Sequence, residues 1–156
     1  MHLPCWVKDA RLARKRNLTI HQFRQATNER NIMVLTLAGL LSRYENDPFF
    51  LQGSEIQIDS VSIDGDSLLH RVCTLGDFEA VSLLIQGGVN VNLQGDMGST
   101  PLHNAVEHLD LKIAELLLES GADPYIKNEF GDDCLAWAIS CKNAGAVSLL
   151  RRWSSG

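Results

Sequence analysis

The chain lacks the short motifs that mark most catalytic and cofactor sites. It contains no Gly-x-x-x-x-Gly-Lys phosphate loop, no Gly-x-Ser-x-Gly nucleophile elbow and no His-Glu-x-x-His zinc helix. Its carboxylates are scattered over turn-like segments, with no apolar pocket in the pattern that would suit acid–base catalysis. The nearest metal-like pair, His70 with Cys73, has no second pair at a suitable spacing. We therefore expect a protein that is not an enzyme and that needs no cofactor or metal.

Long apolar runs are also missing. No run approaches the ~20 residues that cross a bilayer, and the opening of the chain is not a signal-peptide core. Of the four cysteines, Cys5, Cys73, Cys134 and Cys141, the last three fall in helical patterns, where Cys usually acts as a small hydrophobe. We expect a soluble, cytoplasmic protein with no membrane partner.

The strongest positive feature is an internal repeat with a period of 33 residues. Three sets of glycine and leucine positions recur at this interval of 33 residues. They are Gly65, Gly98 and Gly131; Leu69, Leu102 and Leu135; and Leu84, Leu117 and Leu150.

The middle copy predicts two helices and an extended arm. Thr100 is a good N-cap and Pro101 suits the first helical position, so a helix should run from about Pro101 to His108. A second apolar stripe begins at Leu111, and Gly121 is the expected C-terminal cap. The following residues, 122–131, are rich in Asn, Asp and Gly and predict an arm with a tight turn.

The segments Ser67-Leu-Leu-His70, Thr100-Pro-Leu-His103 and Gly121-Ala-Asp123 resemble the ankyrin repeat. The resemblance implies an all-α solenoid of helix-turn-helix units with hairpin-like tips. The expected units span about 64–95, 96–127 and 128–156, after a degenerate N-terminal capping unit over 33–63. It also implies that His70 and His103 are structural and bond to the neighbouring unit.

The two ends of the array depart from the repeat pattern. In the last unit Gly145 should weaken its helix by roughly 1 kcal/mol relative to Ala, and we expect Trp153 to fold over the last apolar edge. In the N-terminal unit the pattern predicts a helix over 34–44, and Asp47-Pro48 could open a second short helix through Leu51.

Charge is divided unevenly along the chain. Residues 1–30 carry seven basic and two acidic side chains, a net charge of +5, and the remainder carries seven basic and seventeen acidic ones, a net charge of −10. The basic N-terminal arm, residues 1–32, has three interpretations: a nucleic-acid or targeting tail, a segment that folds on the acidic units, or solvated sequence. A translation start at Met33 is a further alternative.

The resemblance also implies where a partner would bind, since ankyrin proteins usually grip partners with the tips and the exposed end of each first helix. Ten positions form the predicted binding set, which contains no Lys or Arg, and Ile63, Thr74, Leu75, Ser140 and Cys141 flank it. The set is Asp64, Asp66, Asp96, Met97, Ser99, Glu107, His108, Glu129, Phe130 and Asp132. The simpler alternative is that these are polar turns and that Phe130 packs inward.

An acidic face with apolar anchors favours a basic protein partner, in a monomer or heterodimer, and disfavours nucleic acid except through residues 1–32. No small-molecule substrate is expected. General likeness to small bacterial ankyrin proteins suggests a cytosolic immunity or inhibitor protein against a basic toxin. The alternatives are a generic scaffold or adaptor, and a regulator tethered to nucleic acid by its basic arm.

Overall fold

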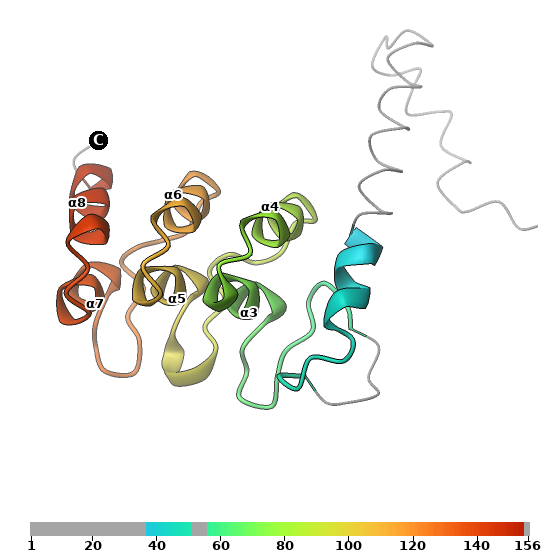
Figure 1. Ribbon diagram of the computed structural model, residues 1–156. Coiled ribbons are helices and arrows are strands. Elements are labelled where there is room, and N and C mark those ends of the chain that lie inside the picture. The colour runs from blue at the N-terminus through green and yellow to red at the C-terminus, as the bar shows by residue number, and fades with distance from the viewer. Residues whose placement is uncertain (1–36, 51–55, 155–156) are drawn as a thin grey trace, which may run out of the picture. The chain divides into compact units, whose positions relative to one another are not determined.

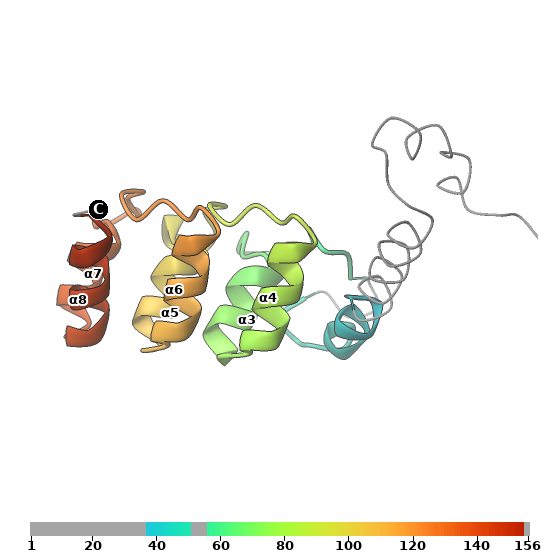
Figure 2. The ribbon, with the colours of Figure 1, turned by 90° about the horizontal axis from the view of Figure 1, so that it is seen from above.

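The computed structural model describes residues 37–50 and 56–154, so the predicted basic arm lies outside the described part. The described residues form an all-α array in which helices pair and the pairs stand side by side (Figures 1 and 2). A helix over residues 37–44 precedes the pairs. The pairs are α3 (Leu68–Leu75) with α4 (Phe78–Gln86), α5 (Pro101–Glu107) with α6 (Leu111–Glu119), and α7 (Cys134–Ser140) with α8 (Ala144–Trp153), and a 3-10 turn, η2 (Asp96–Gly98), lies between the first two pairs.

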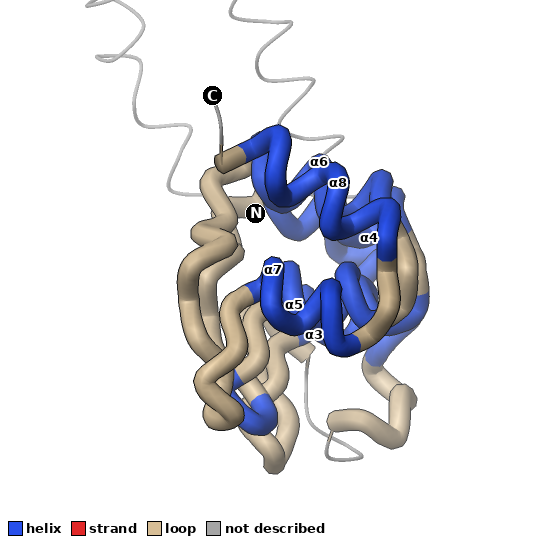
Figure 3. Tube along the Cα trace, turned by 90° about the vertical axis from the view of Figure 1, so that its left-hand side faces the viewer, coloured by secondary structure: helices blue, strands red, loops and turns tan. Residues whose placement is uncertain are grey.

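The helices form two layers. Seen along the stack, α3, α5 and α7 lie in one row, which we call the inner helices, and α4, α6 and α8 lie in a second row, the outer helices (Figure 3). The long arms and their tips lie on one side of the two rows, and the short turns within each pair lie on the other. This is the predicted solenoid of helix-turn-helix units with projecting tips.

Polar side chains start the helices. Asp133 Oδ1 accepts the N–H of Ala136 at 2.9 Å, and Asp110 Oδ1 accepts the N–H of Ile113 at 3.1 Å. Such caps satisfy backbone donors that have no partner inside the helix. The inner helices begin after Ser67, Thr100 and Asp133, and the outer helices after Asp77, Asp110 and Asn143.

The helix ends predicted within the middle unit are confirmed within about one residue. Helix α5 ends at Glu107 with His108 as its cap, and α6 begins at Leu111 as expected. Gly121 follows the end of α6 with φ of 92°, a left-handed conformation that suits glycine after a helix.

Burial between neighbouring pairs holds the array together. Leu69 and Leu102 occupy equivalent positions and are 1% and 0% exposed, and Cys73 and Val106, one turn later, are both fully buried. Inner helices pack on inner helices and outer helices on outer ones, so each apolar stripe is covered by the next unit. In the last pair the next equivalent residue, Ile139, is 54% exposed.

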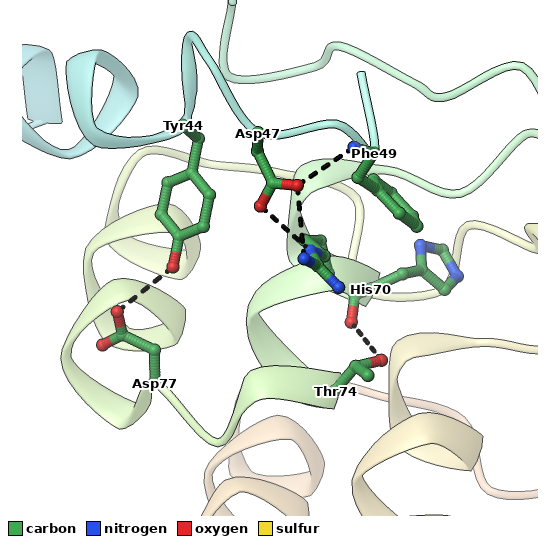
Figure 4. A network of polar contacts seen from close by, with 7 residues as sticks. Tyr44, Asp47, Phe49, His70, Thr74 and Asp77 are labelled. Carbon is green, nitrogen blue, oxygen red and sulfur yellow. Dashed lines mark hydrogen bonds and ion pairs between the residues drawn. The ribbon is translucent and has the colours of Figure 1, made fainter.

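The N-terminal segment is attached to the first pair by polar contacts (Figure 4). The hydroxyl of Tyr44 donates to Asp77 Oδ2 at 3.2 Å, and Arg43 pairs with the same carboxylate. Arg71 donates from Nε and Nη2 to both oxygens of Asp47, at 3.1 and 3.2 Å. The guanidinium also lies 5.2 Å from the centre of the Phe49 ring.

The short helix predicted from Asp47 is wrong over the described residues. Residues 47–50 form a turn, in which the N–H of Phe50 donates to the carbonyl of Asp47 at 3.0 Å. The Asp47 side chain accepts the N–H of Phe49 and is held by Arg71, and these contacts fix the turn. Leu51, the predicted end of this helix, lies outside the described residues, as do positions 34–36 of the preceding one.

Gly145 lies against the preceding outer helix, where a Cβ would lie 2.6 Å from Cδ1 of Leu111, so a larger residue would need the Leu111 side chain to move. The expected cost of Gly145 in helix propensity stays a prediction. Trp153 lies in the last turn of α8 and is 42% exposed, and whether its ring covers the final apolar edge stays a prediction.

The turn within each pair requires a left-handed residue. Gly76 fills this position in the first pair with φ of 69°, but the equivalents are Leu109 and Lys142, with φ of 63° and 57°. For residues with a Cβ this conformation costs roughly 1–2 kcal/mol. Leu109 is also 63% exposed, so burial of its side chain gives little in return.

Candidate partner-binding surface

The tips are rigid because each one is hydrogen-bonded to the next. Asp66 Oδ1 in the first tip accepts the N–H of Asp96 in the second at 2.8 Å, and the carbonyl of Met97 accepts the N–H of Glu129 in the third at 2.9 Å. Gly95 permits the first approach, since a Cβ there would lie 2.0 Å from Asp66 Oδ1. The three tips are therefore joined by hydrogen bonds into a continuous edge.

Buried histidines fix the tips to the inner helices, as the sequence predicted. His70 Nδ1 accepts the N–H of Ser67 at 3.0 Å, which places its proton on Nε2, and Nε2 donates to the carbonyl of Ser99 at 3.1 Å. His103 repeats the arrangement, with Nε2 at 3.3 Å from the carbonyl of Asp132. Burial holds the pKa of both imidazoles below the usual value, against the opposing effect of nearby acceptors and carboxylates.

Seven of the ten predicted binding residues lie on the tips, but they differ in how freely they face solvent. Asp64, Asp96 and Glu129 are exposed, and Met97 and Phe130 are 51% and 63% exposed. Asp66 and Asp132 are half-buried, and the carboxylate of Asp66 already accepts a hydrogen bond from the next tip. Ser99 is a half-buried neighbour of the second tip, whose carbonyl is occupied by His70.

Glu107 and His108 are exposed, but they lie away from the tips. They end helix α5, whose seven residues separate them from its tip by roughly 10 Å at 1.5 Å per residue. The flanking residues Leu75, Ser140 and Cys141 lie at the same end of their inner helices. The structure thus divides the predicted set between the tip edge and the turn side of the inner helices.

Phe130 neither projects alone nor packs inward fully. Its ring stacks on the indole of Trp137 in α7, with centroids 6.2 Å apart and an interplanar angle of 7°. The phenyl ring remains 63% exposed. The pair forms an aromatic surface that joins the third tip to its inner helix.

The sequence analysis did not predict a role for Trp137, although its position in the repeat could have drawn attention to it. It stands 33 residues after Asn104 and 66 after Arg71, one position beyond the two structural histidines and beyond Ala136. All three are half-buried residues on the inner helices. Arg71 is held by Asp47, and Asn104 donates to the hydroxyl of Thr74 at 3.2 Å.

Charge on the tip edge is mainly negative. Asp64, Asp96 and Glu129 are exposed carboxylates, and the basic side chain closest in sequence to the third tip is Lys127 in the arm. The carbonyl of Lys127 accepts a hydrogen bond from Gln94 at 2.9 Å, which ties this arm to the preceding one.

The described residues contain no candidate metal site and no candidate membrane-spanning helix. Over residues 37–50 and 56–154, no three His, Cys, Asp or Glu side chains lie close enough to share a metal ion. In the same part of the chain, no helix is both long enough and apolar enough to cross a membrane. Cys73 and Cys134 are buried free thiols, and Cys141 is a half-buried one.

The stacked helical pairs and the hydrogen-bonded tips define a helical repeat protein. A family model described as ankyrin repeats, in three copies, matches residues 35–128. The chain belongs to the ankyrin-repeat family. The match begins within the predicted N-terminal unit and ends near the start of the last one, and the unit boundaries themselves stay predictions.

Curated relatives share these repeats. The chain is 39% identical over 77 residues to ADP-ribosylation factor GTPase-activating protein AGD4 of Arabidopsis thaliana, covering 49% of this chain and 10% of that protein. It is 41% identical over 71 residues to human 2-5A-dependent ribonuclease, covering 45% and 10%. It is 31% identical over 83 residues to mouse protein phosphatase 1 regulatory subunit 27, covering 53% and 54%. The chain thus matches from a tenth to about half of the length of these proteins.

Ankyrin repeats are protein–protein interaction modules, and the repeat is a non-catalytic fold. One of the relatives is named a ribonuclease, but the similarity covers 10% of that protein. What the shared segment supports for this chain is binding to a protein partner.

Proposed function

We propose that this chain is a non-catalytic binding module that holds a basic protein along its tip edge. The observation that carries the proposal is the alternation of exposed carboxylates with exposed apolar side chains on that edge. Asp64, Asp96 and Glu129 supply the charge, and Met97 and Phe130 supply the apolar contacts. Interfaces commonly combine apolar anchors with a polar, charged rim.

The rigidity of the tips supports this function. The hydrogen bonds from Asp96 to Asp66 and from Glu129 to Met97 hold the backbone of three tips in one arrangement. A surface that is already ordered loses less conformational entropy when a partner binds. The carboxylates would also steer a basic partner in a salt-dependent way and would repel phosphates.

The role of such binding is proposed to be inhibition of a basic protein, in the manner of a cytosolic immunity protein that places carboxylates where a toxin would bind phosphate. Assembly of several partners on a scaffold is the alternative outcome of the tests below. The free thiols of Cys73, Cys134 and Cys141 support a reducing, cytoplasmic location.

The decisive experiment uses two double variants of matched charge change in the full chain. Asp96→Lys with Glu129→Lys reverses the charge of two tips. Glu115→Lys with Glu119→Lys makes the same change at exposed positions of the outer helix α6. Circular dichroism checks that both variants fold.

Partners captured from the native cell at low and moderate salt, identified by mass spectrometry and then purified, are titrated against each variant. We expect one stoichiometric basic protein whose binding is lost with the tip variant and kept with the α6 variant. Equal loss with both variants would show nonspecific electrostatic attraction and would remove the tip edge from the proposal. Several partners that resist salt would favour a scaffold. Nucleic acid bound by the full chain but not by residues 33–156 would move the function to residues 1–32.

A further inference from the structure

We propose that the aromatic pair of Phe130 and Trp137 is the anchoring site for an arginine side chain of the partner. The inference deepens the proposed function and rests on it, because it names the group of a basic protein that the third tip would hold. The two rings are nearly parallel, at 7°, with centroids 6.2 Å apart, and Phe130 is 63% exposed. One side of the phenyl ring is supported by the indole, and most of the ring is open to a ligand.

Trp137 is half-buried and packs against the hydrophobic core, but its polar group is not satisfied there. At the equivalent positions, Arg71 and Asn104 bond to polar partners. The indole Nε1–H of Trp137 is buried and has no hydrogen-bond acceptor among the described residues. Buried donors are normally satisfied, and one left unpaired costs free energy. A large aromatic side chain at this site, kept in spite of that cost, is accounted for if it supports Phe130 as a binding surface.

The third tip holds Phe130 in a fixed place beside negative charge. Asn128 Oδ1 accepts the N–H of Phe130 and the N–H of Asp132, each at 3.0 Å, and the N–H of Glu129 donates to Met97. The carboxylates of Glu129 and Asp132 therefore flank the ring in the chain, one before it and one two residues after it. The tip offers a π face and carboxylates on a backbone that is ordered before binding.

Arginine fits this combination better than lysine does. Its planar guanidinium stacks on aromatic rings while its N–H groups still donate to a carboxylate. The compact lysine ammonium is more strongly hydrated and cannot stack in the same way. A nucleobase would also stack on such a pair, but the phosphates that accompany it would meet the carboxylates of Glu129 and Asp132.

The test uses the full chain and a defined probe. The probe is a short peptide with several arginines separated by Gly and Ser, compared with the same peptide carrying lysine and with one carrying citrulline, the neutral analogue of arginine. Binding is followed by nuclear magnetic resonance through the indole N–H of Trp137, which Trp137→Phe identifies, and by calorimetry. Circular dichroism checks the fold of each variant.

We expect the arginine peptide to shift the Trp137 indole signal and to bind several-fold more tightly than the lysine peptide, with no binding of the citrulline peptide. Phe130→Ala should weaken binding of the arginine peptide about 3- to 30-fold, the range of a cation–π contact. Tyr125→Ala is the matched control. Tyr125 is a 62% exposed aromatic residue in the arm before the third tip, and its replacement should leave binding within a factor of about two.

The other outcomes separate this inference from the proposed function. Equal binding of the arginine and lysine peptides, unchanged by Phe130→Ala, would overturn the arginine site and leave the acidic edge as a binder of basic proteins. Absence of peptide binding would overturn the arginine site. The tip variant Asp96→Lys with Glu129→Lys would still test whether the acidic edge binds a basic protein. Binding of single-stranded oligothymidylate in place of both peptides would overturn the site and the choice of a basic protein together.

Discussion

The exposure of Ile139 allows a direct test of how neighbouring units stabilise one another. Val106 and Ile139 occupy the same position of successive units, but Val106 is 0% exposed and Ile139 is 54% exposed. The difference arises because α7 covers α5, whereas no described element covers the far side of α7. The same position thus exists in a buried and in a half-open form within one molecule.

The expected magnitudes follow from the burial of these two side chains. Val106→Ala removes two buried carbons, about 1.6 kcal/mol at 0.8 kcal/mol per carbon, and the cavity that remains raises the loss to about 2–3 kcal/mol. Ile139→Ala removes three carbons, but about half of their contact is with water and no closed cavity remains, so the loss should be about 1 kcal/mol. The larger deletion should therefore have the smaller effect.

The assay is urea unfolding of the purified protein, followed by far-ultraviolet circular dichroism and by tryptophan fluorescence. The two probes should give coincident transitions if the array unfolds in two states. A loss of stability for Ile139→Ala equal to or greater than that for Val106→Ala would refute the reasoning. It would mean that position 139 is covered in solution.

Three further predictions concern single sites. Leu109→Gly should raise the free energy of unfolding by up to about 1 kcal/mol, because glycine adopts the left-handed conformation without strain and this gain outweighs the added freedom of the unfolded chain. A variant that unfolds at a lower urea concentration would show that Leu109 is not strained. Burial raises the pKa of Asp47, but hydrogen bonds from a backbone amide and from Arg71 bring it below the usual value. The stability that Asp47 contributes is therefore present above its unfolded pKa of about 3.9 and is lost as the pH falls through the lower folded value. Asp47→Asn should flatten the acid side of a plot of Tm against pH. A plot parallel to that of the unchanged protein would exclude this role. Burial raises the pKa of the Cys134 thiol to about 12 and raises the pKa of the Cys73 thiol as well. A thiol reagent should therefore leave both cysteines unlabelled in the native protein. Rapid labelling of either one, seen by mass spectrometry, would show that the core opens.

Most of the fold could be predicted because the repeat encodes local and neighbouring contacts together. Gly65, Gly98 and Gly131 mark the tips and the leucines mark the stacked faces, so one period predicts both the helices and the surfaces they bury. The prediction failed where a single tertiary contact overrides a local preference. The short helix expected from Asp47 is a turn over the described residues, in which Arg71 of the first pair holds the Asp47 carboxylate.

The binding surface could be predicted less completely, for a related reason. A position carried over from a repeat pattern gives its place on the unit but not the other side chains around it. Asp66 was expected to face a partner, but its carboxylate accepts a hydrogen bond from Asp96 in the next tip. Phe130 was expected either to project or to pack inward, and its stacking on Trp137 depends on a residue that no motif marked.

The array separates the residues that stabilise it from those that can bind. The tip backbone is held by His70 and His103, which bond to the carbonyls of Ser99 and Asp132. The exposed side chains of Asp64, Asp96 and Glu129 take no part in these bonds. A charge on an exposed tip residue such as Asp96 can therefore change without breaking the bonds that place it. In contrast, Leu102 is fully buried between units, and its replacement would destabilise the helices that pack around it. Under the proposed function, this division would let a few tip residues determine the identity of a partner while the helices beneath them keep the same stacking.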